Sequence, residues 1–283
     1  MQQTDFQRDA ELPELKIVPL SSLVLHEQTD PERIEALVQR LLKDGVLKNP
    51  PIVAPIPGSH KYVVLDGANR TSALPRVGCR DIVVQVVEYN DPDLDLAVWN
   101  HLVAAPSADD VLGPMRAVRG LRMRKVNIKL ARALLANRGI LAYVVSIDGP
   151  VFAMEGGLNL DDEADLLNRL VGSYHGRLRY FRVKSDELEH LLPYYDGAAA
   201  LVVFPCFEPE DITHLASNGA KLPAGITRHV IPQRALRVNV PLRVLQQDRP
   251  IEEKNGWLHE QIKKRLLNRE IRFYQEATVL FDE

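Results

Sequence analysis

The segment KYVVLDGANRTSAL, residues 61–74, joins an apolar run to a short polar sequence that could bind phosphate. Gly67, directly after the expected strand, allows a tight turn and a close approach of the backbone to a ligand. The helix expected next presents free N–H groups to an anion, and Arg70 can add a two-pronged contact to phosphate. Asp66 could hold Mg²⁺, which binds through one or two carboxylates together with phosphate oxygens. This predicted phosphate cradle would include Gly67, Arg70 and the first N–H groups of the helix.

The same pattern also fits an ordinary Asp-Gly turn whose arginine forms a surface salt bridge, and spacing alone leaves both interpretations open. The common motifs of other phosphate-binding and hydrolytic enzymes are absent: GxxxxGK[ST], the kinase HRD and DFG, GxGxxG after a strand, HExxH and GxSxG. If this chain handles phosphate, it does so by another arrangement of residues.

The composition indicates an ordinary globular protein without a global nucleic-acid footprint. The chain has 283 residues, 46% of them hydrophobic and 26% charged, with a formal net charge of −3. The polar, acidic start MQQTDFQRDA is not typical of a targeting peptide, and no apolar run approaches the length of a membrane span. Cys79 and Cys206 are far apart and lack metal-ligand spacing. These features predict a reduced, cytoplasmic protein with no membrane contact.

The cradle needs flanking strands and helices to position it, and the first hundred residues predict them. Residues 31–44 have the apolar spacing of a helix, with Asp30 as N-cap, Pro31 at the first position and Gly45 at the end. Expected strands cover ELKIVP, SLVL, PPIVAPI, KYVVLD and DIVVQVVEY, and a short helix limited by Pro75 covers ANRTSALPRVG. Residues 91–103, DPDLDLAVWNHLV, repeat the Asp-Pro start and are expected to form a helix.

A domain boundary is expected near residues 105–110, followed by a strongly basic stretch. Residues 115–139 contain eight Lys or Arg and no acidic residue. Such a stretch could contact nucleic acid or phosphate, or it could be a solvated helix face balanced by acids elsewhere, and the weakly acidic remainder favours the second interpretation. Beyond it the sequence predicts a hairpin turning near Asp148-Gly149, helices over DDEADLLNRLVGSYHG and EPEDITHLASNG, strands over LRYFRV and AAALVVFPCF, and a last helix from Ile251 to Gln275.

Several motifs, taken in order, resemble the ParB/sulfiredoxin superfamily and, within it, the free L-serine kinases. The GxxRxxA pattern of that superfamily is met by Gly67, Arg70 and Ala73. The resemblance extends from about Leu15 to Glu283. Its motifs are His26-Glu27, Leu47–Pro51, Leu65–Arg70, Gly225–Pro232 and Arg234–Asn239.

The resemblance implies a role for each of several residues. It places the catalytic glutamate at Glu27, an acid beside His26 just before a helix start, although that position also suits a solvated charge. It implies nucleotide phosphate binding by Gly67, Ala68, Asn69, Arg70 and Thr71, with Asp66 catalytic through Mg²⁺ or phosphate positioning. For the amino-acid substrate we expect pocket residues on the helix predicted over 91–103 and on the late motif, and Arg234 and Asn239 could instead hold two domains together. The expected substrate residues are Trp99, His101, Thr227, Arg228 and His229.

Two departures from relatives narrow this expectation. Ala68 stands where sulfiredoxin carries its catalytic cysteine, which excludes a reductase. Asn69 stands where a histidine is common, so the contact with phosphate or the choice of nucleotide can differ. A nucleotide-binding, ParB-like DNA-binding regulator stays as the alternative, although the strand-rich second half does not suit a helix-turn-helix domain.

The resemblance therefore implies an α+β protein that transfers phosphate to free L-serine and gives O-phospho-L-serine, as in siderophore or cysteine biosynthesis. A flexible tail over residues 1–12 is expected to precede a ParB/sulfiredoxin-like nucleotide-binding domain over 13–105. A mixed α/β domain over 106–283 is expected to complete the active-site cleft. The expected cofactor is Mg²⁺ and the expected donor is ATP or ADP.

Overall fold

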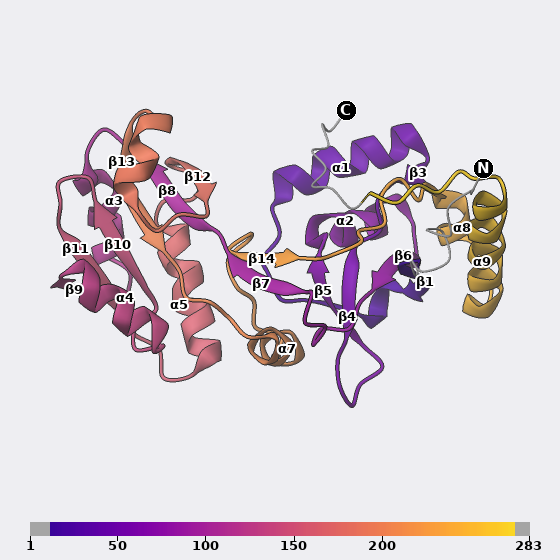
Figure 1. Ribbon diagram of the computed structural model, residues 1–283, viewed down its shortest axis with the longest axis horizontal. Helices are drawn as coiled ribbons and strands as arrows, with labels where there is room; N and C mark the ends of the chain where they lie inside the picture. The colour runs from indigo at the N-terminus through magenta and orange to yellow at the C-terminus, as the bar shows by residue number, and fades with distance from the viewer. Residues whose placement is uncertain (1–11, 275–283) are drawn as a thin grey trace, which may run out of the picture.

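The computed structural model describes residues 12–274, which form two sheets with helices packed on them (Figure 1). The first sheet has the strand order β1-β6-β4-β5-β2, with β2 parallel to β5 and β4 parallel to β6. The other two pairings are antiparallel. Its strands are β1 (Glu14–Pro19), β2 (Leu23–Leu25), β4 (Ile52–Pro55), β5 (Tyr62–Asp66) and β6 (Asp81–Val86).

The helices of the first unit follow the local signals of the sequence. Helix α1 (Pro31–Asp44) begins where the Asp30 carboxylate accepts from the backbone N–H groups of Glu32 and Arg33, and it ends at Gly45, whose φ is +66°. Helix α2 (Ala68–Ala73) passes into the 3₁₀ turn Leu74–Val77, where Pro75 stands. Both helices contribute apolar side chains to the core of the first sheet. The predicted helices here are confirmed.

The second sheet contains six antiparallel strands in the order β12-β8-β13-β10-β11-β9. Helices α3, α5 and α7 pack on one face, and α4 and α6 pack on the other. The strands are β8 (Asn100–Ala104), β9 (Arg122–Val126), β10 (Ala142–Ser146), β11 (Val151–Glu155), β12 (Arg179–Val183) and β13 (Ala198–Val203). The helices are α3 (Ala108–Arg116), α4 (Ile128–Ala136), α5 (Leu160–Gly172), α6 (Leu188–Leu191) and α7 (Pro209–Asn218).

The helix predicted over residues 91–103 is wrong, because this segment forms two strands. Strand β7 (Asp95–Val98) pairs with β14 (Thr227–Val230), and β8 lies between β12 and β13. Pairing with distant strands on both sides of β8 overrides the local helix signal of the Asp-Pro start.

The chain returns to the first unit after β14, which lies between the two sheets in Figure 1. Strand β15 (Val240–Pro241) pairs with β3 (Val46–Leu47), and helices α8 (Leu242–Gln246) and α9 (Ile251–Leu267) join the first core. This topology differs from the predicted domain ranges in two places. Strand β8 lies within the range predicted for the first domain but belongs to the second sheet, and α8 and α9 lie within the range predicted for the second domain but pack with the first sheet. The last helix ends at Leu267, earlier than expected, and Gln275 lies outside the described residues. Within residues 12–274, no helix has both the length and the apolar character needed to cross a membrane.

A buried ion pair attaches α9 to the first sheet and leads to a stability prediction. The Lys254 ammonium, with only 1% of its side chain exposed, donates to the Asp81 carboxylate at 2.5 Å and to the Gln247 carbonyl at 2.6 Å. Replacing Lys254 by methionine leaves Asp81 without its cation and is expected to cost about 3–5 kcal/mol of unfolding free energy. Urea unfolding should show this loss, and Asp81→Leu added to Lys254→Met should recover most of it. A single variant as stable as the wild type would contradict a stabilising role for the pair.

Candidate active site

Glu27 and Asp66 lie at the carboxyl ends of two adjacent parallel strands. Leu25 of β2 is opposite Val64 of β5. Asp66 is the last residue of β5, and Glu27 follows β2 by two residues and bridges to Leu222. Parallel neighbours in a sheet lie about 4.8 Å apart. The two carboxylates predicted from separate motifs therefore belong to one edge of the first sheet.

The Glu27 carboxylate is held by a segment almost 200 residues later in the chain. Its Oε2 accepts from the backbone N–H of Gly225 at 3.0 Å, and its Oε1 accepts from the backbone N–H of Thr227 at 3.1 Å and from the Thr227 hydroxyl. The Leu222 N–H donates to the His26 carbonyl at 2.8 Å, which fixes this segment against β2. Only 14% of the Glu27 side chain is exposed. Three donors thus orient one carboxylate and leave acceptor capacity on Oε2.

Two buried histidines, His26 and His229, pack next to Thr227, which holds Glu27. His26 Nδ1 lies 2.7 Å from the Val64 carbonyl, which only accepts, so Nδ1 carries the proton. Nε2 lies 2.9 Å from the oxygen of the Thr227 hydroxyl, whose single proton is donated to Glu27. His229 Nε2 accepts from the Tyr89 hydroxyl at 2.8 Å, and its ring contacts that of His26 edge to face. Burial lowers the pKa of His26, and burial together with His26 lowers the pKa of His229 to about 3. Both rings are therefore neutral at neutral pH and act as fixed hydrogen-bonding groups.

Asp66 lies between two arginines and keeps one oxygen unoccupied. The guanidinium groups of Arg70 and Arg234 both donate to Oδ2, the former at 2.9 Å. Among residues 12–274, no group donates to Oδ1. Although the described residues contain no cluster of three metal-binding side chains, one free carboxylate oxygen next to a phosphate-binding turn suits Mg²⁺ held together with nucleotide phosphates. Asp66 therefore fits the role of a magnesium ligand.

The turn after Asp66 has the backbone geometry that a phosphate cradle requires. Gly67 has φ of +99°, and a Cβ there would lie 3.0 Å from both Pro51 and Arg70. Gly67 is the N-cap of α2, so the first N–H groups of this helix, starting at Ala68, have no partners within the helix.

The side chains of this turn partly serve the surrounding loops. The Asn69 side-chain oxygen accepts from the Asp30 N–H at 3.0 Å, and Arg70 also donates to the Asn49 carbonyl at 2.9 Å. Thr71 is buried, and its hydroxyl has no partner among the described residues. The turn is therefore fixed in position by Asn69 and Arg70 before any ligand binds.

Trp99 and Arg228 meet at the junction of the two units. Trp99 lies between β7 and β8, and its backbone N–H donates to the Ile226 carbonyl at 2.8 Å. The Arg228 guanidinium lies over the indole at 4.9 Å from the ring centre, which is within the range of a cation–π contact. Both residues adjoin the segment that holds Glu27.

The structure does not bring His101 to this group of residues. His101 is completely buried in the second unit, where Nδ1 is 2.7 Å from the Tyr174 hydroxyl and the ring packs against Tyr180 and Phe204. Burial, helped by the nearby Arg182 cation, lowers the pKa of His101 to about 3. The side chain belongs to a packed aromatic cluster of the second core.

His101 is therefore expected to make stability depend on pH. An unfolded histidine titrates near 6.5, so the unfolded chain binds this proton first as pH falls. The stabilisation is complete above about pH 6.5 and is lost as pH falls toward 3, by about 2 kcal/mol between pH 7 and pH 5. Urea unfolding at both pH values should show a steeper loss for the wild type than for His101→Gln. Parallel losses in the two proteins would contradict this assignment.

The basic stretch of residues 115–139 is largely neutralised by acidic side chains. Arg122 and Arg124 on the edge strand β9 pair with Glu155. Arg132 pairs with Asp186, and Arg138 pairs with Asp211. Guanidinium groups that already have carboxylate partners favour a solvated face over a nucleic-acid contact.

Several residues of the site were not assigned a role from the sequence. Tyr89 contacts His229, Gly225 donates to Glu27, and Arg182 donates to the Ala224 carbonyl. Arg234, expected only to hold two domains together, donates to Asp66. The glycine at the start of the GITRH motif, Gly225, could have indicated a turn at this point of the chain. The structure places it at φ of +69°, a conformation that favours glycine. Nothing in RYFRV distinguishes Arg182 from any other strand arginine.

Curated proteins of similar sequence are named as serine kinases, whereas no family model matches the chain. The ATP-dependent L-serine kinase SbnI of Staphylococcus aureus is 24% identical over 262 residues, which cover 86% of this chain and 88% of that protein. The ADP-dependent L-serine kinase SerK of Thermococcus kodakarensis is 22% identical over 236 residues, covering 81% and 91% respectively.

A solved structure described as a free serine kinase in complex with AMP has the same fold. It superposes with a TM-score of 0.73 at 18% identity and covers 83% of this chain and 95% of that one. The protein thus has the mixed α/β fold of the free serine kinases. The resemblance predicted from the sequence is confirmed, and it extends through both sheets.

Proposed function

We propose that this protein is a nucleotide-dependent free L-serine kinase that produces O-phospho-L-serine. The observation that carries the proposal is the Glu27 carboxylate, which is fixed by Gly225 and Thr227 near the end of the first sheet where β5 ends at Asp66, in a chain with the fold of free serine kinases. Curated relatives named as ATP-dependent and ADP-dependent L-serine kinases support it further.

In the proposed reaction, Glu27 is the general base. The acceptor hydroxyl donates to Oε2, transfers its proton there, and its oxygen forms the new bond to phosphorus while the bond to the leaving phosphate oxygen breaks. The donors on Oε1 and Oε2 hold the carboxylate in one orientation, so the proton acceptor stays aligned throughout the transfer.

The nucleotide phosphates would bind at the turn that follows Asp66. We assign the first N–H groups of α2 and the exposed part of Arg234 to the phosphate oxygens, with Arg70 fixing the turn. Asp66 Oδ1 would hold Mg²⁺, which supplies charge neutralisation on the phosphate oxygens. Asn69 and Thr71 complete the proposed cradle.

The amino acid would bind where the two units meet, in a cleft between a ParB/sulfiredoxin-like first domain and the second domain. Trp99, Thr227, Arg228 and His229 come from the β7 and β14 region that links the two sheets. This assignment places the donor on the first unit and the acceptor at the junction. The two cysteines are free, as we expect for a cytoplasmic enzyme.

The test is a turnover assay of the purified protein with Mg²⁺, L-serine and either ATP or ADP. Mass spectrometry should detect O-phosphoserine, and the donor that supports turnover identifies the nucleotide. L-Threonine and L-homoserine in place of serine define the acceptor. Absence of phosphoserine with either donor, in protein that still binds nucleotide, would overturn the proposal.

A further inference from the structure

Arg182, on the second sheet, lies against the loop that orients Glu27. Strand β12 pairs with β8 so that Arg182 is opposite His101. Its guanidinium donates to the Ala224 carbonyl at 3.1 Å, and a Cβ on Gly225 would overlap it. The N–H of this same Gly225 donates to Glu27, so Arg182 reaches the immediate surroundings of the proposed base from the other unit.

The charge of Arg182 has no acidic partner in the part of the chain that the structure describes. Its one hydrogen bond to a protein group is to Ala224, although the side chain is only partly exposed. Arg228, stacked on Trp99, likewise forms no salt bridge within residues 12–274. Cations withdrawn from water are stabilised by an anion. Two such guanidinium groups, one bound to the segment that holds Glu27 and one on that segment itself, indicate an anion site at the junction.

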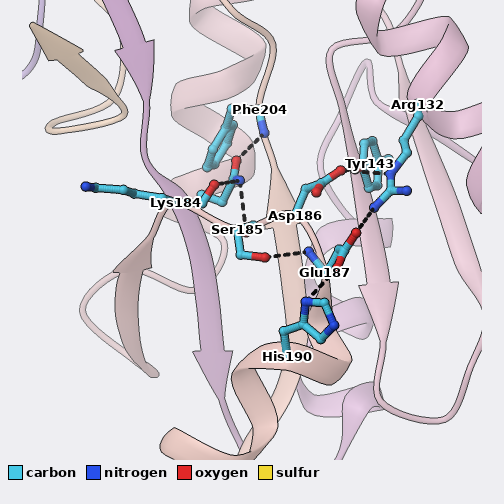
Figure 2. A network of polar contacts seen from close by, with 9 residues as sticks. Arg132, Tyr143, Lys184, Ser185, Asp186, Glu187, His190 and Phe204 are labelled. Atoms are coloured by element: carbon cyan, nitrogen blue, oxygen red, sulfur yellow. Dashed lines mark hydrogen bonds and ion pairs between the residues drawn. The ribbon is translucent and has the colours of Figure 1, made fainter.

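A network of polar contacts fixes the segment that follows β12, two to five residues after Arg182 (Figure 2). Buried Asn100 donates to the carbonyls of Lys184 and Ser185, and its oxygen accepts from the Phe204 N–H at 3.3 Å. Asp186 accepts from Arg132 at 2.8 Å. These contacts hold the backbone next to Arg182 without a ligand, and pairing with β8 holds the strand itself.

The chemistry of the acceptor identifies the anion. In serine, the α-carboxylate is joined to the hydroxyl through two carbon atoms, so a hydroxyl on Glu27 requires the carboxylate nearby. The planar fork of an arginine matches a carboxylate with two parallel hydrogen bonds. The nucleotide phosphates are assigned to the Asp66 end, where Arg70 and Arg234 already supply cations.

We propose that Arg182 binds the α-carboxylate of the acceptor and thereby selects an amino acid over an amino alcohol. The inference rests on the proposed serine kinase function. It makes Arg182 a specificity residue that the second domain contributes to a site whose base lies on the first.

The test compares L-serine with ethanolamine, which has the hydroxyl and the amine but no carboxylate. Arg182→Gln is expected to raise KM for serine by about 10- to 100-fold, as expected from the loss of charge-assisted hydrogen bonds. Its KM for nucleotide and its turnover of ethanolamine should stay near wild type, so the preference for serine falls. Arg182→Lys should restore part of the serine affinity. Arg179→Gln, on the same strand with its guanidinium over Phe181, is the matched control and should change nothing.

Each other outcome has a definite meaning. An unchanged serine KM, an increase in the nucleotide KM alone, or equal losses on serine and ethanolamine would overturn the inference. If the wild type phosphorylates no serine, the proposed function fails, and calorimetric titration of serine into the wild type and Arg182→Gln then tests the site. Binding lost only in the variant supports the assignment, and absence of binding to both overturns it.

Discussion

Replacing Glu27 by glutamine is expected to lower kcat for serine phosphorylation by about 10²- to 10⁴-fold, the range for loss of a general base. The amide has nearly the same shape but does not accept the hydroxyl proton. Nucleotide affinity should persist, because the phosphates are assigned to the turn after Asp66. The measurement is single-turnover formation of phosphoserine, with ADP binding followed by titration.

The glutamine also changes the hydrogen bonds around position 27, which requires its own control. The carboxylate accepts from both Gly225 and Thr227, whereas an amide turns its NH₂ group toward one of these donors. Glu27→Asp retains the charge and shortens the side chain, so it should keep more activity than the glutamine variant if charge is what matters. Wild-type turnover by Glu27→Gln would show that another group takes the proton.

The parts of the fold that were predicted correctly are those decided by neighbours in the sequence. Asp30, Pro31 and Gly45 each act within one turn of α1, so cap and stop signals were sufficient. Strands β7 and β8 depend on partners more than 70 residues away, and a local Asp-Pro signal therefore gave the wrong element. The return of α8 and α9 to the first core is equally a matter of distant packing.

The residues of the candidate site also separate into those that local motifs indicate and those that only distant contacts position. The proposed roles of Glu27 and Asp66 came from motifs, and the parallel pairing of β2 with β5 brings the two segments to the same end of the first sheet. His101 was expected beside Trp99 from its position in the chain, but the second core encloses it. Arg182 contacts the loop at Ala224 only because the two units pack together, and the local sequence around Arg182 does not indicate this contact.

Because the proposed base and its orienting segment come from distant parts of the chain, the site requires the junction to be intact. The segment from Leu222 to Val230 contacts the first sheet at His26, donates to Glu27 and pairs with β7. A change that loosens this segment would remove the donors of Glu27 and the anion site together. Serine affinity and catalysis are therefore expected to fall together in such variants, in contrast to Arg182→Gln.

The second large effect is expected at Asp66. Asp66→Asn should lower turnover by about 10²-fold or more and raise the Mg²⁺ concentration needed for half-maximal rate, since a neutral amide replaces the assigned metal ligand and the partner of two arginines. Arg234→Gln provides the matched comparison, because it removes one cation from Oδ2 and keeps the carboxylate. It should weaken nucleotide binding while leaving the Mg²⁺ requirement near that of the wild type. Magnesium titrations of phosphoserine formation separate the two effects, and an Asp66→Asn protein with the wild-type rate and magnesium dependence would remove Asp66 from the proposed metal site.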